Sequence, residues 1–209
     1  FSDNRLSKGI LCCTGCNQFT IPRLILTLIL ISFLLSSVFF VNENTGWTAG
    51  YHGTVMNTTD GGVNWTLQEV LYAYYISTYF ADSSNGWITG YFGVIINTTD
   101  GGLNWNRQTS NVADYLYSVE FVNKNTGWAV GGNGDERAHI IKTTNGGVNW
   151  LIQKTLYNYE VMRSVSFINE STGWAVGDNK LVLKTTDAGV NWIITRTANI
   201  ANLYGVDFK

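Results

Sequence analysis

The chain has 209 residues, a net charge of −2 and only 13% charged residues. Its few lysines and arginines form no basic run, so the composition excludes a nucleic-acid-binding surface built on charge. Aromatic residues reach 14%, and there are 22 glycines but a single proline, which is typical of all-β proteins with many tight turns.

An apolar run, LILTLILISFLL, occupies residues 24–35 and follows Arg23. It is shorter than the roughly 20 residues that a membrane-spanning helix needs, but its length suits the apolar core of a secretory signal. We therefore expect residues 1–36 to be a leader that exports the protein to a periplasm, a thylakoid lumen or the cell surface. An uncleaved N-terminal anchor is the alternative, and membrane contact is expected through this segment only.

The same leader contains all three cysteines, Cys12, Cys13 and Cys16. No second cysteine pair and no nearby histidine completes a four-ligand metal set. The two histidines, His52 and His139, are also isolated in the sequence. We therefore predict neither a metal site nor a cofactor.

All eight tryptophans fall into two series that repeat along the chain. One series follows glycine in NTGWTAG, SNGWITG, NTGWAVG and STGWAVG, at Trp47, Trp87, Trp128 and Trp174. The other closes the octapeptides TTDGGVNW, TTDGGLNW, TTNGGVNW and TTDAGVNW, at Trp65, Trp105, Trp150 and Trp192. The repeat length of 40 to 46 residues indicates a repeat architecture.

Each repeat reads as four short strands separated by turns rich in Asn, Asp and Gly, as in YSVEFV, GWAVG, HIIKTT and VNWLIQK of the third. This pattern predicts an all-β protein, a β-propeller with four-stranded blades. Blades are expected at about 37–72, 73–115, 116–160 and 161–202. Residues 203–209 resemble the first strand of a fifth blade, so we expect part of a larger propeller, with a four-bladed ring as the alternative.

The octapeptide joins the third and fourth strands of each blade. Its aspartate is expected to accept hydrogen bonds from the backbone of the turn, its glycine to provide a left-handed conformation, and its tryptophan to pack over the turn. Asn145 keeps the accepting oxygen without the charge, which argues for a structural and against a catalytic role. The residues assigned to this role are Thr58, Asp60, Gly62, Trp65, Thr98, Asp100, Gly102, Trp105, Thr143, Asn145, Gly147, Trp150, Thr185, Asp187, Gly189 and Trp192.

The octapeptide resembles the Asp-box, or bacterial neuraminidase repeat, of sialidases, sortilin ectodomains and several glycosidases. Together with FVNKNTGWAVG and FINESTGWAVG ahead of it, the array at 37–209 is similar to the photosystem II stability and assembly factor family. That resemblance implies an exported propeller, usually of seven blades, that binds photosystem subunits without catalysing a reaction. Similar repeats occur in secreted and surface proteins of non-photosynthetic bacteria.

One face of such a propeller carries the connections between strands two and three and between blades. It is the predicted binding face, because tyrosines there offer contact area at low entropic cost. Its candidates are Tyr51, His52, Tyr91, Phe92, Asp135, Glu136, Arg137, Tyr157, Arg163 and Lys180. Blade connections add Tyr72, Tyr74, Tyr75, Tyr115, Tyr117, Tyr159 and Tyr204. The alternatives are that some tyrosines belong to the core and that Asp135–Arg137 is a solvated loop.

An enzyme is the weaker hypothesis. The arginines Arg107, Arg137, Arg163 and Arg196 lie in no sialidase-like context, and no motif selects a catalytic pair among Glu69, Asp114, Glu120 and Glu160. We therefore predict no catalytic residue and a non-catalytic scaffold for protein partners such as photosystem or envelope subunits. An adhesion or carbohydrate-binding module that holds a surface glycan is the first alternative, and a glycoside hydrolase fragment is the second.

Overall fold

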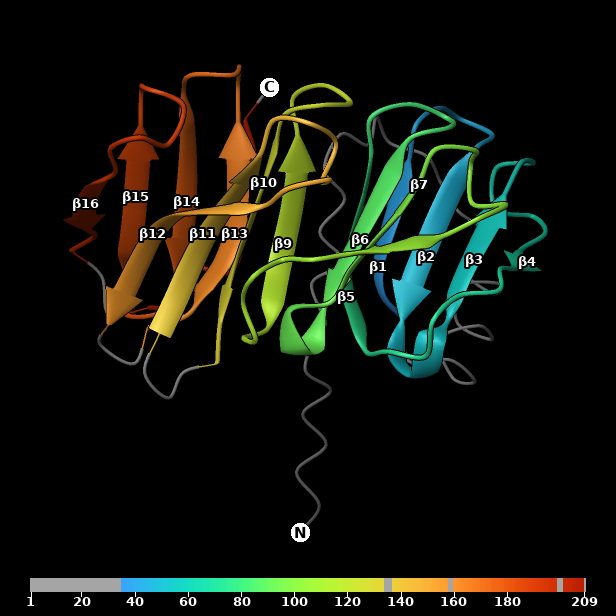
Figure 1. The fold of residues 1–209 in the computed structure, drawn as a ribbon, viewed down its shortest axis with the longest axis horizontal. Helices are drawn as coiled ribbons and strands as arrows, with labels where there is room; N and C mark the ends of the chain where they lie inside the picture. The colour runs from blue at the N-terminus through green and yellow to red at the C-terminus, as the bar shows by residue number, and fades with distance from the viewer. Residues whose placement is uncertain (1–34, 134–136, 158–159, 199–200, 209) are drawn as a thin grey trace, which may run out of the picture.

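The computed structural model describes residues 35–133, 137–157, 160–198 and 201–208. Within them, the strands form four antiparallel sheets of four strands each, and in every sheet the strands are adjacent in chain order. The first strands of successive sheets lie next to one another, so that the sheets stand side by side as blades (Figure 1). The predicted propeller architecture is confirmed.

The strands repeat closely from blade to blade. Blade 1 comprises β1 (Leu35–Phe40), β2 (Gly46–Gly50), β3 (Val55–Thr58) and β4 (Thr66–Leu67). Blade 2 comprises β5 (Tyr75–Phe80), β6 (Gly86–Gly90), β7 (Ile95–Thr98) and β8 (Asn106–Gln108). Blade 3 comprises β9 (Leu116–Phe121), β10 (Gly127–Gly132), β11 (Arg137–Thr143) and β12 (Leu151–Tyr157). Blade 4 comprises β13 (Met162–Phe167), β14 (Gly173–Gly177), β15 (Leu181–Thr185) and β16 (Ile193–Arg196).

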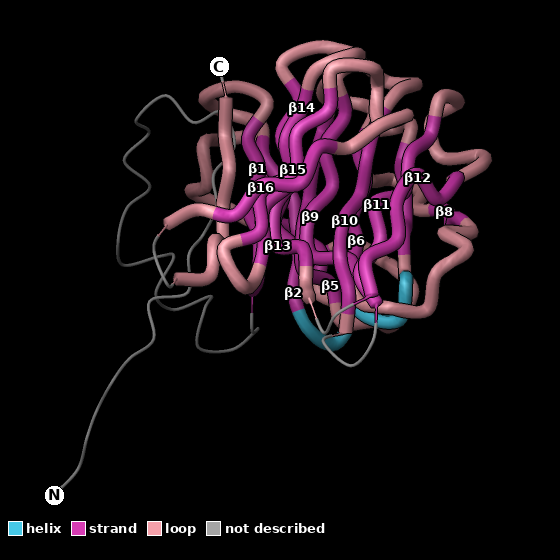
Figure 2. The backbone as a smooth tube through the Cα atoms, turned by 90° about the vertical axis from the view of Figure 1, so that its left-hand side faces the viewer, coloured by secondary structure: helices cyan, strands magenta, loops and turns pink. Residues whose placement is uncertain are grey.

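The two ends of the strands form two different faces. Because all neighbours are antiparallel, the octapeptide turns lie at one end, which we call the Asp-box face. The connections between second and third strands and between blades lie at the other end, the turn face. Two one-turn 3₁₀ helices, η1 (Tyr51–Gly53) and η2 (Tyr91–Gly93), belong to the turn face (Figure 2).

Hydrogen bonds within the octapeptide shape each turn on the Asp-box face. In blade 2, the Thr98 hydroxyl donates to Asp100 Oδ1 over 2.8 Å and accepts from the Gly102 N–H over 2.8 Å. Asp100 also accepts from the backbone N–H of Asn104 over 2.9 Å and from its side-chain amide over 2.7 Å. Gly102 has a φ of 97°, which a residue with a Cβ rarely adopts. The aspartate therefore cross-links the turn that joins the third strand of the blade to the fourth.

The tryptophans that follow a glycine join neighbouring blades. Each stacks on the phenylalanine that ends the first strand of the next blade: Trp47 on Phe80 at 3.7 Å, Trp87 on Phe121 at 3.6 Å and Trp128 on Phe167 at 3.5 Å. The octapeptide tryptophans Trp105, Trp150 and Trp192 approach the same phenylalanines edge-on. Both tryptophan series thus converge on one ring at each junction, which explains why they repeat together.

Residues 203–208 occupy the position of a first strand beside blade 4. Phe208 packs against Trp174 with ring centroids 4.1 Å apart, and its N–H donates to Ser166 Oγ over 3.3 Å. The Val206 N–H donates to Ser164 Oγ over 3.2 Å. The segment therefore makes the contacts that β13 makes with blade 3, where the Val165 N–H donates to Ser118 Oγ.

The leader predicted at the N-terminal end overlaps the first blade in part and otherwise lies outside the described residues. Leu35 begins β1 and pairs with Gly50, so the apolar segment predicted at 24–35 and the leader predicted at 1–36 overlap the first blade at their C-terminal end. The rest of that leader, with Cys12, Cys13 and Cys16, lies outside the described residues. No helix within the described ranges is long and apolar enough to cross a membrane.

Candidate functional site

Five tyrosines from blades 1 to 3 form a continuous ladder on the turn face. The ring centroids of Tyr51 and Tyr74 lie 5.3 Å apart, those of Tyr74 and Tyr91 5.6 Å, and those of Tyr91 and Tyr115 4.2 Å. Tyr117 continues the series, 6.2 Å from Tyr115. We call these five residues the tyrosine ladder. Each ring is held by its neighbours, so the ladder is a preformed aromatic surface.

Hydroxyl hydrogen bonds fix the rings further. The hydroxyls of Tyr51 and Tyr91 lie 3.2 Å apart, and Nδ1 of His52 lies 2.8 Å from the Tyr72 hydroxyl. The hydrogen bond from Tyr51, together with partial burial, raises the pKa of Tyr91 to about 12. Tyr91 therefore stays neutral at physiological pH and presents a polar but uncharged tip.

The helices η1 and η2 each hold a bulky residue in the left-handed region, His52 at φ 59° and Phe92 at φ 55°. Such a conformation costs on the order of 1–3 kcal/mol for a non-glycine residue and is most common at functional positions. In η2 the turn is tight, since a Cβ on Gly93 would lie 1.9 Å from the Val112 carbonyl oxygen. Phe92 is 68% exposed, with its ring beside Tyr91 and Tyr115 of the ladder.

A groove of about 270 Å³ adjoins the ladder, and it is lined by Leu71, Tyr72, Ala73, Tyr74, Tyr91, Phe92, Val94 and Arg107. Tyr72 is 66% exposed at its rim. Arg107 makes no ion pair within the described ranges. The groove is therefore aromatic, with a single positive charge, and suits an extended chain that carries apolar side chains and a carboxylate.

Arg163 ends the aromatic surface on the blade 4 side. Its guanidinium lies 4.7 Å from the ring centroid of Tyr117 and 5.9 Å from that of Tyr204. Its Nε and one terminal nitrogen donate to the two carboxylate oxygens of Asp178 over 3.0 and 2.8 Å. The charge of Arg163 is thus matched by Asp178, so Arg163 is not a free cation on this face. Its contact with Tyr117 links blade 4 to blade 3.

The structure brings together only some of the candidates predicted on this face. Tyr51 and Tyr91 belong to the ladder, His52 and Phe92 contact it, and Arg163 lies at its far end. Arg137 and Tyr157 are cross-strand partners at the turn end of blade 3, and Lys180 lies in the turn before β15. Asp135 and Glu136 lie outside the described residues.

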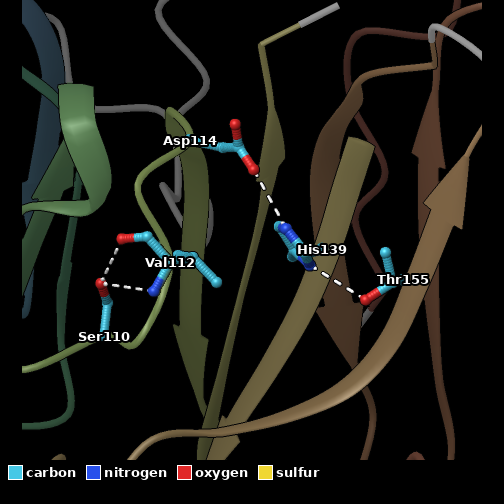
Figure 3. Close-up of polar contacts among 5 residues, drawn as sticks. All are labelled: Ser110, Val112, Asp114, His139 and Thr155. Carbon is cyan, nitrogen blue, oxygen red and sulfur yellow. Dashed lines mark hydrogen bonds and ion pairs between the residues drawn. The ribbon is translucent and has the colours of Figure 1, made fainter. Parts of the chain in front are cut away.

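A second site escaped the sequence analysis because its residues are far apart in the chain. Buried His139 lies with Nε2 3.0 Å from Asp114 Oδ2 and Nδ1 3.1 Å from the Thr155 hydroxyl, and Ser110 fixes the preceding connection by bonding to Val112 (Figure 3). Val112, Asp114 and His139 line a pocket of about 370 Å³. His52 also has a side-chain partner, since its Nδ1 lies 2.8 Å from the Tyr72 hydroxyl.

The carboxylates considered for catalysis mostly have structural partners. Glu120 accepts a 2.8 Å hydrogen bond from the Phe167 N–H, Glu160 pairs with Arg196, and Asp114 pairs with His139. Within the described ranges, no group of three His, Cys, Asp or Glu residues is placed to hold a metal ion.

The four-stranded blades, the octapeptide turns and the stacked junctions define an Asp-box β-propeller. The profile of the family described as photosynthesis system II assembly factor YCF48 matches residues 26–110 and 105–201. The chain belongs to this family.

Solved structures with similar folds include two assembly factors and a glycoside hydrolase. A structure described as YCF48 bound to D1 peptide is 20% identical with a TM-score of 0.64, over 82% of this chain and 56% of that one. YCF48 from Cyanidioschyzon merolae is 21% identical with a TM-score of 0.64, over 83% and 59%. A GH74 enzyme of Niastella koreensis is 19% identical with a TM-score of 0.61, over 77% and 30%.

These similarities establish the fold, and the chain spans less than two thirds of the length of the YCF48 structures that it matches. In a comparison with curated proteins, nothing matches.

Proposed function

We propose that the protein is a non-catalytic scaffold that binds an extended segment of a protein partner on its turn face. The observation that carries this proposal is the tyrosine ladder with its adjoining groove, which forms a preformed aromatic surface across three blades. Rigid aromatic rings supply binding energy with little loss of conformational entropy, and exposed anchors such as Phe92 are typical of the centre of an interface.

Membership in the assembly factor family supports a photosystem subunit as the partner. A protein of the same fold has been solved with a bound D1 peptide, so a D1 segment is the natural first probe. The structural partners of Asp114, Glu120 and Glu160 support a role without catalysis.

Peptide binding to variants of the turn face tests this proposal. Anisotropy of a fluorescein-labelled D1 peptide is measured with the full chain and with the double variant Tyr72→Ala/Phe92→Ala. Both side chains are mostly exposed, so their loss removes anchors without opening the core. We expect affinity to fall by roughly tenfold or more.

Leu103→Ala is the matched control, because Leu103 is 82% exposed on the Asp-box face. It should leave the affinity unchanged. Failure of the unaltered chain to bind would reject the D1 partner, and an equal loss in the control would reject the turn face as the binding surface.

The same proposal includes export. The apolar run at 24–35 after Arg23 supports it. Expression of the full chain in a bacterium, followed by fractionation and mass spectrometry of its N-terminus, checks this. Recovery from the cytoplasm with an intact N-terminus would contradict export.

A further inference from the structure

Four aromatic rings in a row line the groove beside the tyrosine ladder. Tyr72 and Phe92, at the two ends of the row, are 66% and 68% exposed. The partly buried rings of Tyr74 and Tyr91 connect them, with consecutive ring centroids 6.3, 5.6 and 6.2 Å apart. The lining therefore offers aromatic faces and edges on which flat apolar groups pack.

An exposed tyrosine is not a general requirement of the connection that carries Tyr72. Tyr72 lies eight residues before Phe80, the last residue of β5, and Ala113 takes the same position before Phe121 at the end of β9. Before blade 4 this position holds Tyr159, which lies outside the described residues. The folding of a blade therefore does not explain why an aromatic ring is exposed beside this groove.

The backbone of the groove leaves few hydrogen-bond acceptors for a ligand. Carbonyl oxygens of the lining already accept hydrogen bonds within the protein, namely those of Leu71, Ala73, Tyr74, Tyr91 and Val94. None of the described residues that line the groove is an aspartate or a glutamate. A ligand that brings many N–H groups would therefore leave some of them unpaired on binding, which costs free energy for each group.

The groove does offer hydrogen-bond donors. Only one hydroxyl of the Tyr51–Tyr91 pair can donate to the other, so the second proton remains for a ligand. Arg107 lines the groove, is exposed and makes no ion pair within the described ranges. Its guanidinium N–H groups can therefore donate to carbonyl oxygens. The groove thus suits a ligand that accepts hydrogen bonds and donates few.

We propose that the groove binds a proline-rich segment in the polyproline II conformation. The inference rests on the proposed protein-binding function and names the class of segment that is bound. Proline has no backbone N–H, and the polyproline II helix has no internal hydrogen bonds, so all its carbonyls remain free to accept. Its rings pack on aromatic side chains, and its fixed backbone loses little entropy on binding. A segment in the β conformation fits less well, because it brings N–H groups that need acceptors.

Fluorescence anisotropy of two labelled peptides with the full chain tests the inference. One probe is octaproline. The other has the same length and alternates valine with threonine, which favours the β conformation and keeps every backbone N–H. The labelled D1 peptide is measured beside them. Octaproline should bind at least roughly tenfold more tightly than the valine–threonine peptide.

Two variants locate the binding site of octaproline. Arg107→Met removes donors at an exposed position and keeps an unbranched stem, so it should weaken octaproline binding by roughly threefold to tenfold. Tyr72→Ala/Phe92→Ala removes both exposed rings and should weaken it further. Leu103→Ala, on the Asp-box face, is the control and should leave the affinity unchanged.

The outcomes separate this inference from the proposed function. Equal affinity for the two probes, a preference for the valine–threonine peptide, or octaproline binding that neither groove variant weakens would overturn the inference. Binding of the D1 peptide would then still support the protein-binding function. Tight binding of octaproline without binding of the D1 peptide would support the inference and reject D1 alone as the partner. If none of the three peptides binds at millimolar concentration, both proposals fail.

Discussion

At the scale of single residues, the octapeptide aspartate acts as a hydrogen-bond acceptor. The bond from the Asn104 amide, followed by those from the Asn104 N–H and Thr98, lowers the pKa of Asp100 to about 2. In blade 3, Asn145 accepts from Thr143 and from the Asn149 N–H over 3.0 Å each. The amide thus preserves the turn geometry, as the sequence comparison indicated, although an amide is the weaker acceptor.

We predict that Asp100→Ala lowers the melting temperature of the protein more than Asp100→Asn, because only the amide keeps an acceptor for the turn. The pKa of Asp100 is lowered on folding, so its contribution to stability is present above the unfolded pKa of about 3.8. That contribution is lost as the pH falls towards 2. Thermal unfolding between pH 2 and pH 7 checks both points, and equal melting temperatures for the two variants would contradict them.

Glu120 is a partly buried carboxyl group at a blade junction. Burial raises its pKa to about 8, despite the hydrogen bond that it accepts from Phe167. The folded state therefore holds a proton that the unfolded state releases above about pH 4.5. Its contribution to stability is full below that pH and declines as the pH rises through about 8.

Glu120→Gln should therefore flatten the dependence of the melting temperature on pH between 5 and 8. The melting temperature of the variant should rise relative to that of the unaltered protein as the pH rises. The neutral amide keeps an acceptor for the Phe167 N–H without the cost of a buried charge. Thermal denaturation across this pH range is the measurement. Glu69→Gln, at an exposed position before β5, is the control and should change the profile little.

At the scale of elements, the stacked Trp–Phe pair is the main apolar contact between neighbouring blades. Trp87 is 1% exposed and stacks on Phe121, and its indole N–H donates to the Gly146 carbonyl of the next octapeptide. At the next junction, Lys142 bonds to the equivalent carbonyl of Ala188, and the indole nitrogen of Trp128 has no hydrogen-bond partner among the described residues. The junctions are thus equivalent in stacking but not in hydrogen bonding.

Trp87→Ala should cost about 3–5 kcal/mol of unfolding free energy, because it opens a cavity in the core and removes one of the two hydrogen bonds to the Gly146 carbonyl, the other coming from Gln108. Trp174→Ala should cost less, since Trp174 packs on Phe208 at a tilt of 34° and is only partly buried. Denaturant unfolding of both variants checks the order. Equal costs would show that residues 203–208 complete a full junction.

The repeated motifs predicted the blades because each signal is local. A TGW run and an octapeptide fix the second strand and the turn between the third and fourth strands without reference to distant residues. The pair Asp114–His139 could not be recognised in this way, since 25 positions separate its members. Aligning the repeats would have given a signal, because His139 stands where the other blades have Thr54, Val94 and Leu181.

At the scale of the whole molecule, the two faces have different characters. The turn face combines the tyrosine ladder, its groove and the blade 3 pocket. The Asp-box face exposes an aliphatic residue from each octapeptide, namely Val63, Leu103, Val148 and Val190. The blades orient these surfaces, since each strand runs from one face to the other. Composition predicted the class of fold. The clustering of the tyrosines and of the pocket residues on the turn face depends on how the four repeats are placed in space.

The hydrogen bonds between first strands have a consequence for how such a chain can change. Ser118, Glu120 and Ser166 each accept from a backbone N–H of the following blade, and Tyr79 donates to a backbone carbonyl. A backbone group is the same whatever side chain it carries. Duplication, loss or exchange of a blade-length stretch of the gene would therefore join new neighbours through existing contacts, and a single blade could diverge, as blade 3 has, without weakening its junctions.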